Sequence, residues 1–410
     1  MAELPTSVSS GSGAEFNGAD ELDVIKRRLC DEVDARASTL VEVSRALHAH
    51  PELGFAETFA HDLLTGAIAA EGLEVQRSAY GLATAFACDA GVEGPTVAVL
   101  CEYDALPGLG HACGHNVIAA AGLGAGLAAA AIAGEVGGRV RILGTPAEEG
   151  GGGKVYMLDA GAFTGCDAAM MVHPAEADLT EIHAIAVQQV VATYSGVAAH
   201  AAAAPHEGRN ALDAAVLGYV NIAALRQHIR DDERLHGVFT NGGDKPNIVP
   251  SRASTHWYVR AGDMTRLDSL RPRVETCLRA GADATGCTVE LEWLDPAFAN
   301  LVSNDPLVEL YVANARRLGR DPQVPTAATA VIGSTDMGNV SHAVASIHPM
   351  IAVSPPGVFI HTPEFAIHAG GPGGDQAVID GAKAMAMTVA DLWCNADARH
   401  QVLHHFAARR

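Results

Sequence analysis

Residues 96–134 read TVAVLCEYDALPGLGHACGHNVIAAAGLGAGLAAAAIAG, and this stretch joins a short apolar run, a polar motif and a long apolar segment. Thr96–Leu100 follows Gly94-Pro95 and is apolar and β-rich, which is typical of a buried central strand. Val117–Gly134 carries no charge and is about as long as a membrane span. Because it consists almost entirely of alanine and glycine, which drive membrane insertion weakly, we predict a close-packed core helix instead.

The polar motif His111-Ala112-Cys113-Gly114-His115 places one thiol and two imidazoles within five residues. Thiolate and imidazole are ligands that zinc and its neighbouring metals prefer. The alternative is a buried thiol beside a histidine that caps the helix, since cysteine is among the most buried residue types. The density of the cluster favours a metal site.

The composition indicates a folded protein of two or three domains. The chain has 410 residues, of which 49% are hydrophobic and 18% charged. Its formal net charge of −21 would repel phosphate backbones, so we expect no nucleic-acid partner. The eight cysteines occur singly, which is typical of the reducing cytoplasm. Residues 1–20 lack the basic and apolar regions of a signal peptide, and we predict a flexible tail.

Strand and helix patterns alternate over the first part of the chain. Helical spacing covers Asp23–Leu47 and Glu57–Ala70, and further strands are predicted at Leu73–Ser78, Ala83–Asp89, Val140–Gly144 and Ala168–Val172. This alternation predicts an α/β layer with helices on both faces of a sheet.

The middle of the chain follows a different order. Strands are predicted at Val187–Ser195, Val238–Asn241, Ser254–Arg260 and Thr288–Leu294, and helices at Asn210–Ile229 and Met264–Thr285. The order β-α-β-β-α-β is ferredoxin-like. Because none of the suspected ligands falls in this block, we predict an inserted domain at residues 187–296. The main domain would then comprise residues 21–186 and 297–410.

Further polar chemistry follows other predicted strands. The acidic pair Glu148-Glu149 follows one strand, His173 follows the next, and His361 precedes a turn far down the chain. One carboxylate of such a pair can bind a metal while the other acts as general base. Each feature has a simpler alternative, a solvated acidic turn or a packed histidine. Together they lie where α/β sheets gather their sites, just after strands.

Several longer motifs resemble one family. The matching stretches are His50-Pro51-Glu52-Leu53 with Glu57, Tyr103–Pro107, His111–Asn116, Pro146–Gly150, His200-Ala201-Ala202 with Pro205-His206, Pro246–Pro250, Gly333–Asp336 and His361-Thr362. In this collinear series the chain resembles the co-catalytic metallopeptidases of clan MH, family M20. It is most similar to the branch of β-alanyl-lysine dipeptidases and aminobenzoyl-glutamate hydrolases. The resemblance implies a mixed-sheet α/β/α catalytic domain with an inserted ferredoxin-like lid and dimerisation domain.

The resemblance also implies a site with two divalent metals, most simply zinc, with manganese, cobalt or nickel as alternatives. One metal would bind Cys113, His115 and Glu149, and the other Cys113, His173 and His361. Glu148 would act as general base and acid for a hydroxide held by the two metals.

Outside the ligand set, the resemblance implies roles in the lid and around the metals. His200 would cross a homodimer and stabilise the oxyanion in the partner's site. Asn247, Arg260, Gly333 and Ser334 would bind substrate, although Arg260 could equally be an exposed strand residue. Glu102 and Asp104 would support the ligand histidine, with Glu102 standing where relatives carry aspartate.

We therefore expect a cytoplasmic homodimeric metallohydrolase that cleaves the amide bond of a small dipeptide or N-acyl amino acid, without nucleic-acid or membrane partners. Two alternatives stay open. One is a metal-stabilised binding protein without catalysis, against which Glu148 argues. The other is a redox-sensing thiol at Cys113.

Overall fold

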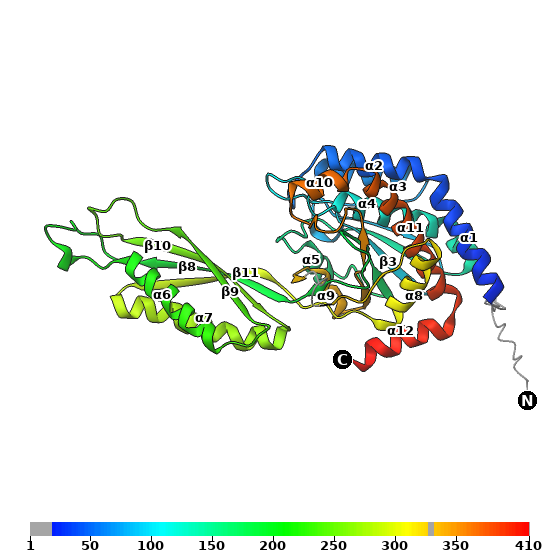
Figure 1. Cartoon of the computed structure of the whole chain (residues 1–410). Coiled ribbons are helices and arrows are strands. Elements are labelled where there is room, and N and C mark those ends of the chain that lie inside the picture. The colour runs from blue at the N-terminus through cyan, green and yellow to red at the C-terminus, as the bar shows by residue number, and fades with distance from the viewer. Residues whose placement is uncertain (1–18, 327–331, 410) are drawn as a thin grey trace, which may run out of the picture.

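The computed structural model describes residues 19–326 and 332–409, which form a larger and a smaller lobe (Figure 1). The smaller lobe extends away from the larger one, so the molecule is elongated. The predicted N-terminal tail lies almost wholly outside the described residues.

The larger lobe is built on a mixed sheet, in agreement with the predicted fold class. Its strand order is β1 (Gln76–Arg77), β2 (Phe86–Ala90), β4 (Arg139–Gly144), β3 (Thr96–Cys101), β5 (Ala168–Met170) and β13 (Ala345–Ile347). The last four run parallel, whereas β2 is antiparallel to both of its neighbours. Every residue of β3 is buried, which confirms the predicted central strand. Two short parallel pairs lie outside this sheet, β6 (His173–Ala175) with β14 (Met350–Ala352) and β7 (His183–Ala184) with β12 (Ile332–Gly333).

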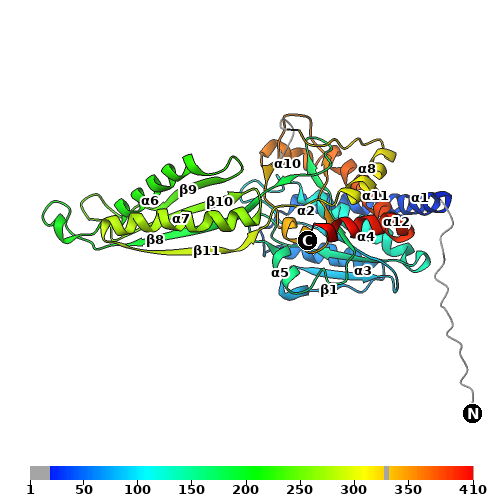
Figure 2. The same cartoon turned by 90° about the horizontal axis from the view of Figure 1, so that it is seen from below.

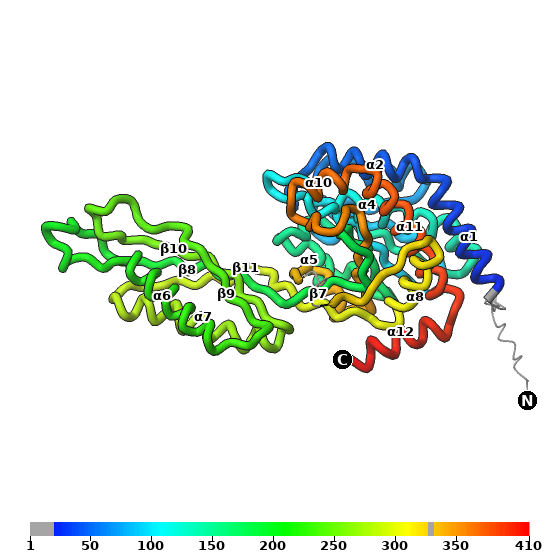
Figure 3. Tube along the Cα trace, viewed as in Figure 1, coloured from blue at the N-terminus to red at the C-terminus, as the bar shows by residue number. Residues whose placement is uncertain are grey.

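Helices cover both faces of this sheet (Figure 2). One core contains side chains of α1 (Ala19–Ala35), α2 (Ala37–Ala49), α3 (Thr58–Ala70), α4 (His115–Val136), α8 (Asp305–Arg317), α10 (Pro363–Ala369), α11 (Pro372–Cys394) and α12 (Ala396–Ala408). The other contains side chains of α5 (Gly153–Asp159) and α9 (Met337–Ser341). Successive residues of β3 alternate between the two, with Val97 and Val99 in the first and Ala98 and Leu100 in the second. Helix α1 packs against α11 from the opposite end of the sequence (Figure 3).

Helix α4 is the predicted core helix, and the structure confirms it. By length and composition it could cross a membrane, but 83% of its most apolar stretch is buried inside the fold. Its small residues have a packing reason, since a Cβ at Gly122 would lie 2.4 Å from the carbonyl oxygen of Leu100, and one at Gly126 would lie 2.5 Å from Ile142. Glycine therefore lets α4 approach β3 and β4 closely enough to fix the motif at its N-terminus.

We predict that Gly122→Ala destabilises the protein by about 1–3 kcal/mol, because the added methyl group has no space against the backbone of β3. The matched control is Gly134→Ala near the exposed end of the same helix, where a Cβ would meet nothing within 4 Å. That change should stabilise the protein by up to about 1 kcal/mol through helix propensity. Urea unfolding of both variants checks the prediction, and equal shifts in the two would contradict the packing argument.

The smaller lobe contains the predicted β-α-β-β-α-β order. Its antiparallel sheet has the order β11 (Thr288–Phe298), β8 (Ala186–Ser195), β10 (Arg252–Ala261) and β9 (Arg234–Asn241). Helices α6 (Ala211–Leu225) and α7 (Met264–Thr285) pack on one face and share a separate hydrophobic core with it. Short 3-10 turns lie at Ala79–Gly81, Pro205–Glu207 and Arg226–His228.

Some element boundaries differ from the sequence prediction. The single helix predicted at Asp23–Leu47 is two helices, broken at Arg36. The guanidinium of Arg36 binds the carboxylates of Glu32 and Glu71, which joins the break to the end of α3. The strand predicted at Leu73–Ser78 is reduced to the two residues of β1, and β9 begins four residues before the predicted start.

Candidate functional site

The five predicted metal ligands lie together at one edge of the large sheet. Cys113 lies at the end of the loop from β3 to α4, His115 is the first residue of α4, Glu149 follows β4, and His173 begins β6 just after β5. His361 precedes α10. Because β3, β4 and β5 are parallel, their carboxyl ends bring these loops to the same place.

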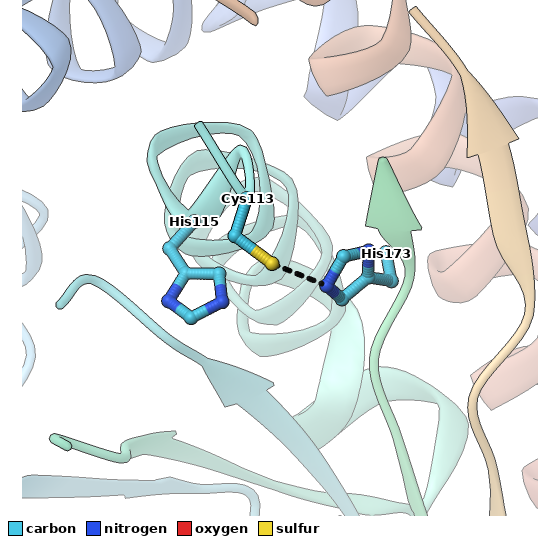
Figure 4. Close-up of side chains that lie close together, drawn as sticks. All are labelled: Cys113, His115 and His173. Carbon is cyan, nitrogen blue, oxygen red and sulfur yellow. Dashed lines mark hydrogen bonds between the residues drawn. The ribbon is translucent and has the colours of Figure 1, made fainter. Parts of the chain in front are cut away.

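The thiol of Cys113 occupies the centre of this group. Its Sγ lies 3.4 Å from Nε2 of His173 and 3.3 Å from Nε2 of His361. Figure 4 shows the thiol pointing toward the His173 ring, with His115 beside it. Nε2 of His361 lies 3.3 Å from Oε1 of Glu149, and Nε2 of His115 lies 3.9 Å from the same oxygen. Because this sulfur belongs to two candidate ligand groups, Cys113 would be able to contribute to each of two metals.

Two of the ligand groups that the distances define combine these residues differently from the predicted partition. The ligand atoms of Cys113, His115 and His173 lie within 4.8 Å of one another, and so do those of Cys113, Glu149 and His361. The prediction instead paired His115 with Glu149 and His173 with His361. His115 lies near both His173, with ring centroids 6.0 Å apart, and Glu149, whose Oε1 is 3.9 Å from Nε2 of His115, while His361 contacts Glu149.

Hydrogen bonds on the outer side orient two of the imidazoles. Nδ1 of His115 lies 3.1 Å from Oδ1 of Asp104, and Oδ2 of Asp104 accepts from the backbone N–H of Glu149 at 2.9 Å. Nδ1 of His173 donates to the carbonyl of Pro174 at 2.7 Å. With Nδ1 engaged, Nε2 of each ring is left as a lone-pair donor toward the thiol. Asp104 therefore has the supporting position predicted for it.

These residues fit divalent metals by their own geometry. Nε2 of His115 and Oε1 of Glu149 are buried and make no hydrogen bond within the described residues, and a cation would satisfy both. Burial raises the pKa of the Cys113 thiol well above its usual range, and bound dications stabilise a thiolate in such a place. A thiolate, three imidazoles and a carboxylate suit zinc, and also cobalt, nickel or manganese.

Glu148 lies beside the ligands and is buried near two other carboxylates. It lines the same cavity, and its Oε2 is 4.0 Å from Nε2 of His115. Burial, followed by the charges of Glu102 and Glu149, raises the pKa of Glu148 well above its usual range. A carboxyl group that holds a proton this readily suits transfer to a leaving amine.

The backbone before Glu148 is held by a residue whose role the sequence did not reveal. Ala147 has φ of +58°, a conformation that costs free energy for a residue with a side chain. Its N–H donates to Oε1 of the fully buried Glu57 at 2.8 Å, and Oε2 of Glu57 accepts from Thr84 at 2.8 Å. In the sequence Glu57 is only part of a motif. Its contact with the backbone N–H of Ala147 joins residues 90 positions apart, and no local sequence pattern predicts such a contact.

Glu102 departs from its predicted role. Its Oε2 comes no nearer than 3.7 Å to Nε2 of His115, the nitrogen that faces the thiol, and Asp104 binds the other nitrogen. The nearest charged group to Glu102 is the ammonium of Lys154, whose Nζ lies 2.6 Å from Oε1, although neither oxygen of Glu102 makes a hydrogen bond of good geometry within the described residues. The ligand histidine is therefore supported by Asp104, and Glu102 belongs to a separate buried ion pair.

A cavity of about 810 Å³ opens over the ligands between the two lobes. Arg260, Gly333 and Ser334 line it, as predicted for substrate contacts. Nη1 of Arg260 donates to Oγ of Ser334 at 2.9 Å, and that hydroxyl donates to the carbonyl of Ile185 at 2.7 Å. The alternative of Arg260 as an exposed strand residue is wrong, because its side chain is partly buried in this cavity.

His200 and Asn247 do not reach this cavity within the same chain. They are neighbours, since the N–H of Ala201 donates to the carbonyl of Asn247 at 3.1 Å, and both are exposed. Nδ1 of His200 accepts from the N–H groups of Ala202 and Ala203. His200 lies in the loop after β8 and Asn247 in the loop between β9 and β10, and both loops lie at the end of the smaller lobe farthest from the larger lobe (Figure 1).

Two further histidines lie behind the ligands. His111, the first residue of the opening motif, is buried against His48, with ring centroids 6.3 Å apart, and takes no ligand position. His348 stacks on His173 at 5.3 Å and lines the cavity. No sequence pattern singles out His348, which follows the short strand β13 without any motif.

The chain is similar in sequence and in fold to known peptidases. The model of peptidase family M20/M25/M40 matches residues 95–391. The chain is 41% identical over 391 residues to the Xaa-Arg dipeptidase of Mus musculus, covering 92% of this chain and 90% of that protein. It is 39% identical over 402 residues to the Xaa-Arg dipeptidase of Homo sapiens, covering 93% of this chain and 91% of that protein. The fold is similar to that of a dinuclear metal-binding peptidase of Bacillus subtilis, with a TM-score of 0.67, 20% identity and coverage of 88% and 99%.

Proposed function

The chain belongs to peptidase family M20/M25/M40, as its motifs predicted, and we propose that it is a two-metal dipeptidase acting on small dipeptides that end in arginine. The observation that carries this proposal is the set of five convergent ligands with Glu148 beside them in one cavity. The C-terminal arginine is taken from the name of the relative that is 41% identical. A structural metal site would have no use for an ionisable acid beside its ligands.

The ligand geometry supports one metal on Cys113, His115 and His173 and another on Cys113, Glu149 and His361. When bound, two divalent ions supply Lewis acidity toward the amide carbonyl and lower the pKa of water in the site. We propose zinc, with manganese, cobalt and nickel as alternatives that the same donors accept.

The chain's own residues perform the proton transfers and hold the substrate. Glu148 accepts a proton from the attacking water and delivers it to the amine nitrogen of the departing amino acid. Arg260 binds the substrate's terminal carboxylate. Burial lowers the pKa of Arg260, and no carboxylate within the described residues forms an ion pair with it, so an incoming carboxylate supplies the missing charge.

We predict that metal-loaded protein hydrolyses alanyl-arginine and that Arg260→Gln raises KM for it by about 10- to 100-fold with little change in kcat, as expected for the loss of a charged hydrogen bond. Alanyl-arginine amide, which lacks the carboxylate, is the matched control. The wild-type protein and Arg260→Gln should hydrolyse it equally poorly. Steady-state kinetics measure both values. A protein that is inert toward dipeptides and N-acyl amino acids with all four metals would instead support a binding protein without catalysis.

We further propose a homodimer formed through the smaller lobe. Val216, Leu217 and Val220 of α6 and Val238 and Phe239 of β9 are exposed apolar residues on adjacent elements. β9 is an edge strand, and its free hydrogen-bonding groups can pair with those of a second copy about a two-fold axis. A dimer of this kind would let His200 and Asn247 serve the partner's cavity, which they do not reach in their own chain.

For location we propose the cytoplasm. All eight cysteines are free thiols in the structure, including the central Cys113, and this state suits a reducing compartment. Nothing in the proposed chemistry requires a membrane or a nucleic acid, and we propose small peptides as the substrates and a second copy as the partner.

A further inference from the structure

Lys154 is a fully buried lysine held between two carboxylates. Its Nζ lies 2.6 Å from Oε1 of Glu102 and 2.6 Å from Oδ1 of Asp336. The backbone N–H of Lys154 also donates to Oδ2 of Asp336 at 2.9 Å. All three side chains have no exposed surface. A buried ammonium of this kind persists only where its partners are fixed, because the loss of one partner leaves a buried charge without compensation.

The two carboxylates belong to different parts of the site. Glu102 directly follows β3, and its other oxygen faces His115. Asp336 is the residue before α9 and closes the loop that begins with β12. Lys154 itself is the second residue of α5, just after the loop that carries Glu148 and Glu149. One side chain therefore ties together three segments that surround the cavity.

The loop held by Asp336 is the one that meets the lid. Ser334 lies two residues before Asp336, accepts a hydrogen bond from Arg260 of the smaller lobe and donates one to Ile185. A continuous series of contacts thus runs from Glu102 through Lys154 and Asp336 to the loop that positions Arg260. Among the described residues Ser334 is the hydrogen-bond partner of the Arg260 guanidinium, which also lies 5.5 Å over the ring of Tyr258 on the same strand.

A purely structural role would not require this placement. The same lobe contains a second buried lysine, Lys26, whose Nζ lies 2.6 Å from Asp391 and 2.8 Å from Asn314. That group joins α1, α8 and α11, and none of its members adjoins a residue that lines the cavity. Lys154 differs because both of its partners adjoin residues of the site.

We propose that Lys154 is a positioning residue that holds residues 332–336 in place, so that Ser334 can present Arg260 to the substrate's carboxylate. This inference deepens the proposed function and rests on it for the identity of the group that Arg260 binds. Lys154 touches neither the substrate nor the reacting atoms.

The test compares Lys154→Met with Lys26→Met, which removes a buried lysine of the same kind elsewhere in the lobe. Both variants should lose stability. Only Lys154→Met should raise amide hydrogen exchange of residues 332–336, by about tenfold or more, and raise KM for alanyl-arginine by about tenfold with bound metal unchanged. If Lys154→Met does not fold, hydrogen exchange and KM are measured on Asp336→Asn, which keeps the contact between Lys154 and Glu102 and should show the same two increases.

A double-mutant cycle separates positioning from general destabilisation. If Asp336 acts through Arg260, then Asp336→Asn should raise KM in the wild-type background and add little in the Arg260→Gln background. Independent effects in the cycle, or unchanged exchange of residues 332–336 in both Lys154→Met and Asp336→Asn, would overturn the inference. Failure of the wild-type protein to hydrolyse alanyl-arginine would overturn the proposed substrate instead, and the exchange measurement would still decide the role of Lys154.

Discussion

Glu148→Gln is expected to lower kcat for alanyl-arginine by at least about 10³-fold while both metals stay bound. The amide has nearly the same shape as the carboxylate but does not accept the proton of the attacking water or return it to the leaving amine. The environment of Glu148 points to this role, since burial and the charges of Glu102 and Glu149 raise its pKa. Steady-state kinetics and metal analysis of the purified variant give the two quantities needed.

The matched control is Glu149→Gln, one residue further along the same loop. It should release one metal, because Glu149 forms a ligand group with Cys113 and His361. The comparison also tests a second arrangement, since His115, Glu148 and Glu149 lie close enough together to form a ligand group of their own. If Glu148→Gln loses metal as Glu149→Gln does, Glu148 is a ligand. If it retains full activity, another residue is the base.

The candidate polar clusters could be located because most of them follow the parallel strands of one sheet, whereas their assignment as one ligand set came from the resemblance to the family. Cys113, Glu149 and His173 each come soon after a recognisable apolar run, and strand direction alone brings the carboxyl ends of such runs together. Their division between two metals could not be predicted in this way. It depends on which way each side chain leaves its loop, and the contact of His361 with Glu149 joins residues more than 200 positions apart.

The roles of Lys154 and Glu57, which hold the loops around the site, could not be predicted from sequence patterns for a related reason. Lys154 follows a run of glycines and reads as an ordinary lysine at the start of a helix, yet its partner Asp336 lies 182 positions away. Glu57 likewise acts on a backbone group far from it. Periodicity reports which face of an element is buried, but it does not report which buried charges meet. The break between α1 and α2 was missed because Arg36, rather than glycine or proline, occupies it.

His200→Ala is expected to lower kcat by about 10²- to 10³-fold, the usual effect of removing one donor to a developing oxyanion. Within its own chain His200 is exposed, follows the end of β8 that points away from the larger lobe and does not line the cavity, so an effect of this size requires a second copy. Kinetics of the variant measure the loss. If the variant is a monomer with full activity, both the proposed dimer and the proposed role of His200 are wrong.

Mixing two inactive variants decides whether His200 acts across the dimer. In a mixed dimer of His200→Ala and Glu148→Gln, one site has an intact Glu148 from its own chain and an intact His200 from the partner, whereas the other site has neither. With random exchange, half of the dimers are mixed and one of their two sites works, so about a quarter of wild-type activity should return. If both residues served the same chain's cavity, every site would carry one lesion and mixing would restore nothing. Because each variant is inactive alone, recovered activity can come only from sites built by two chains.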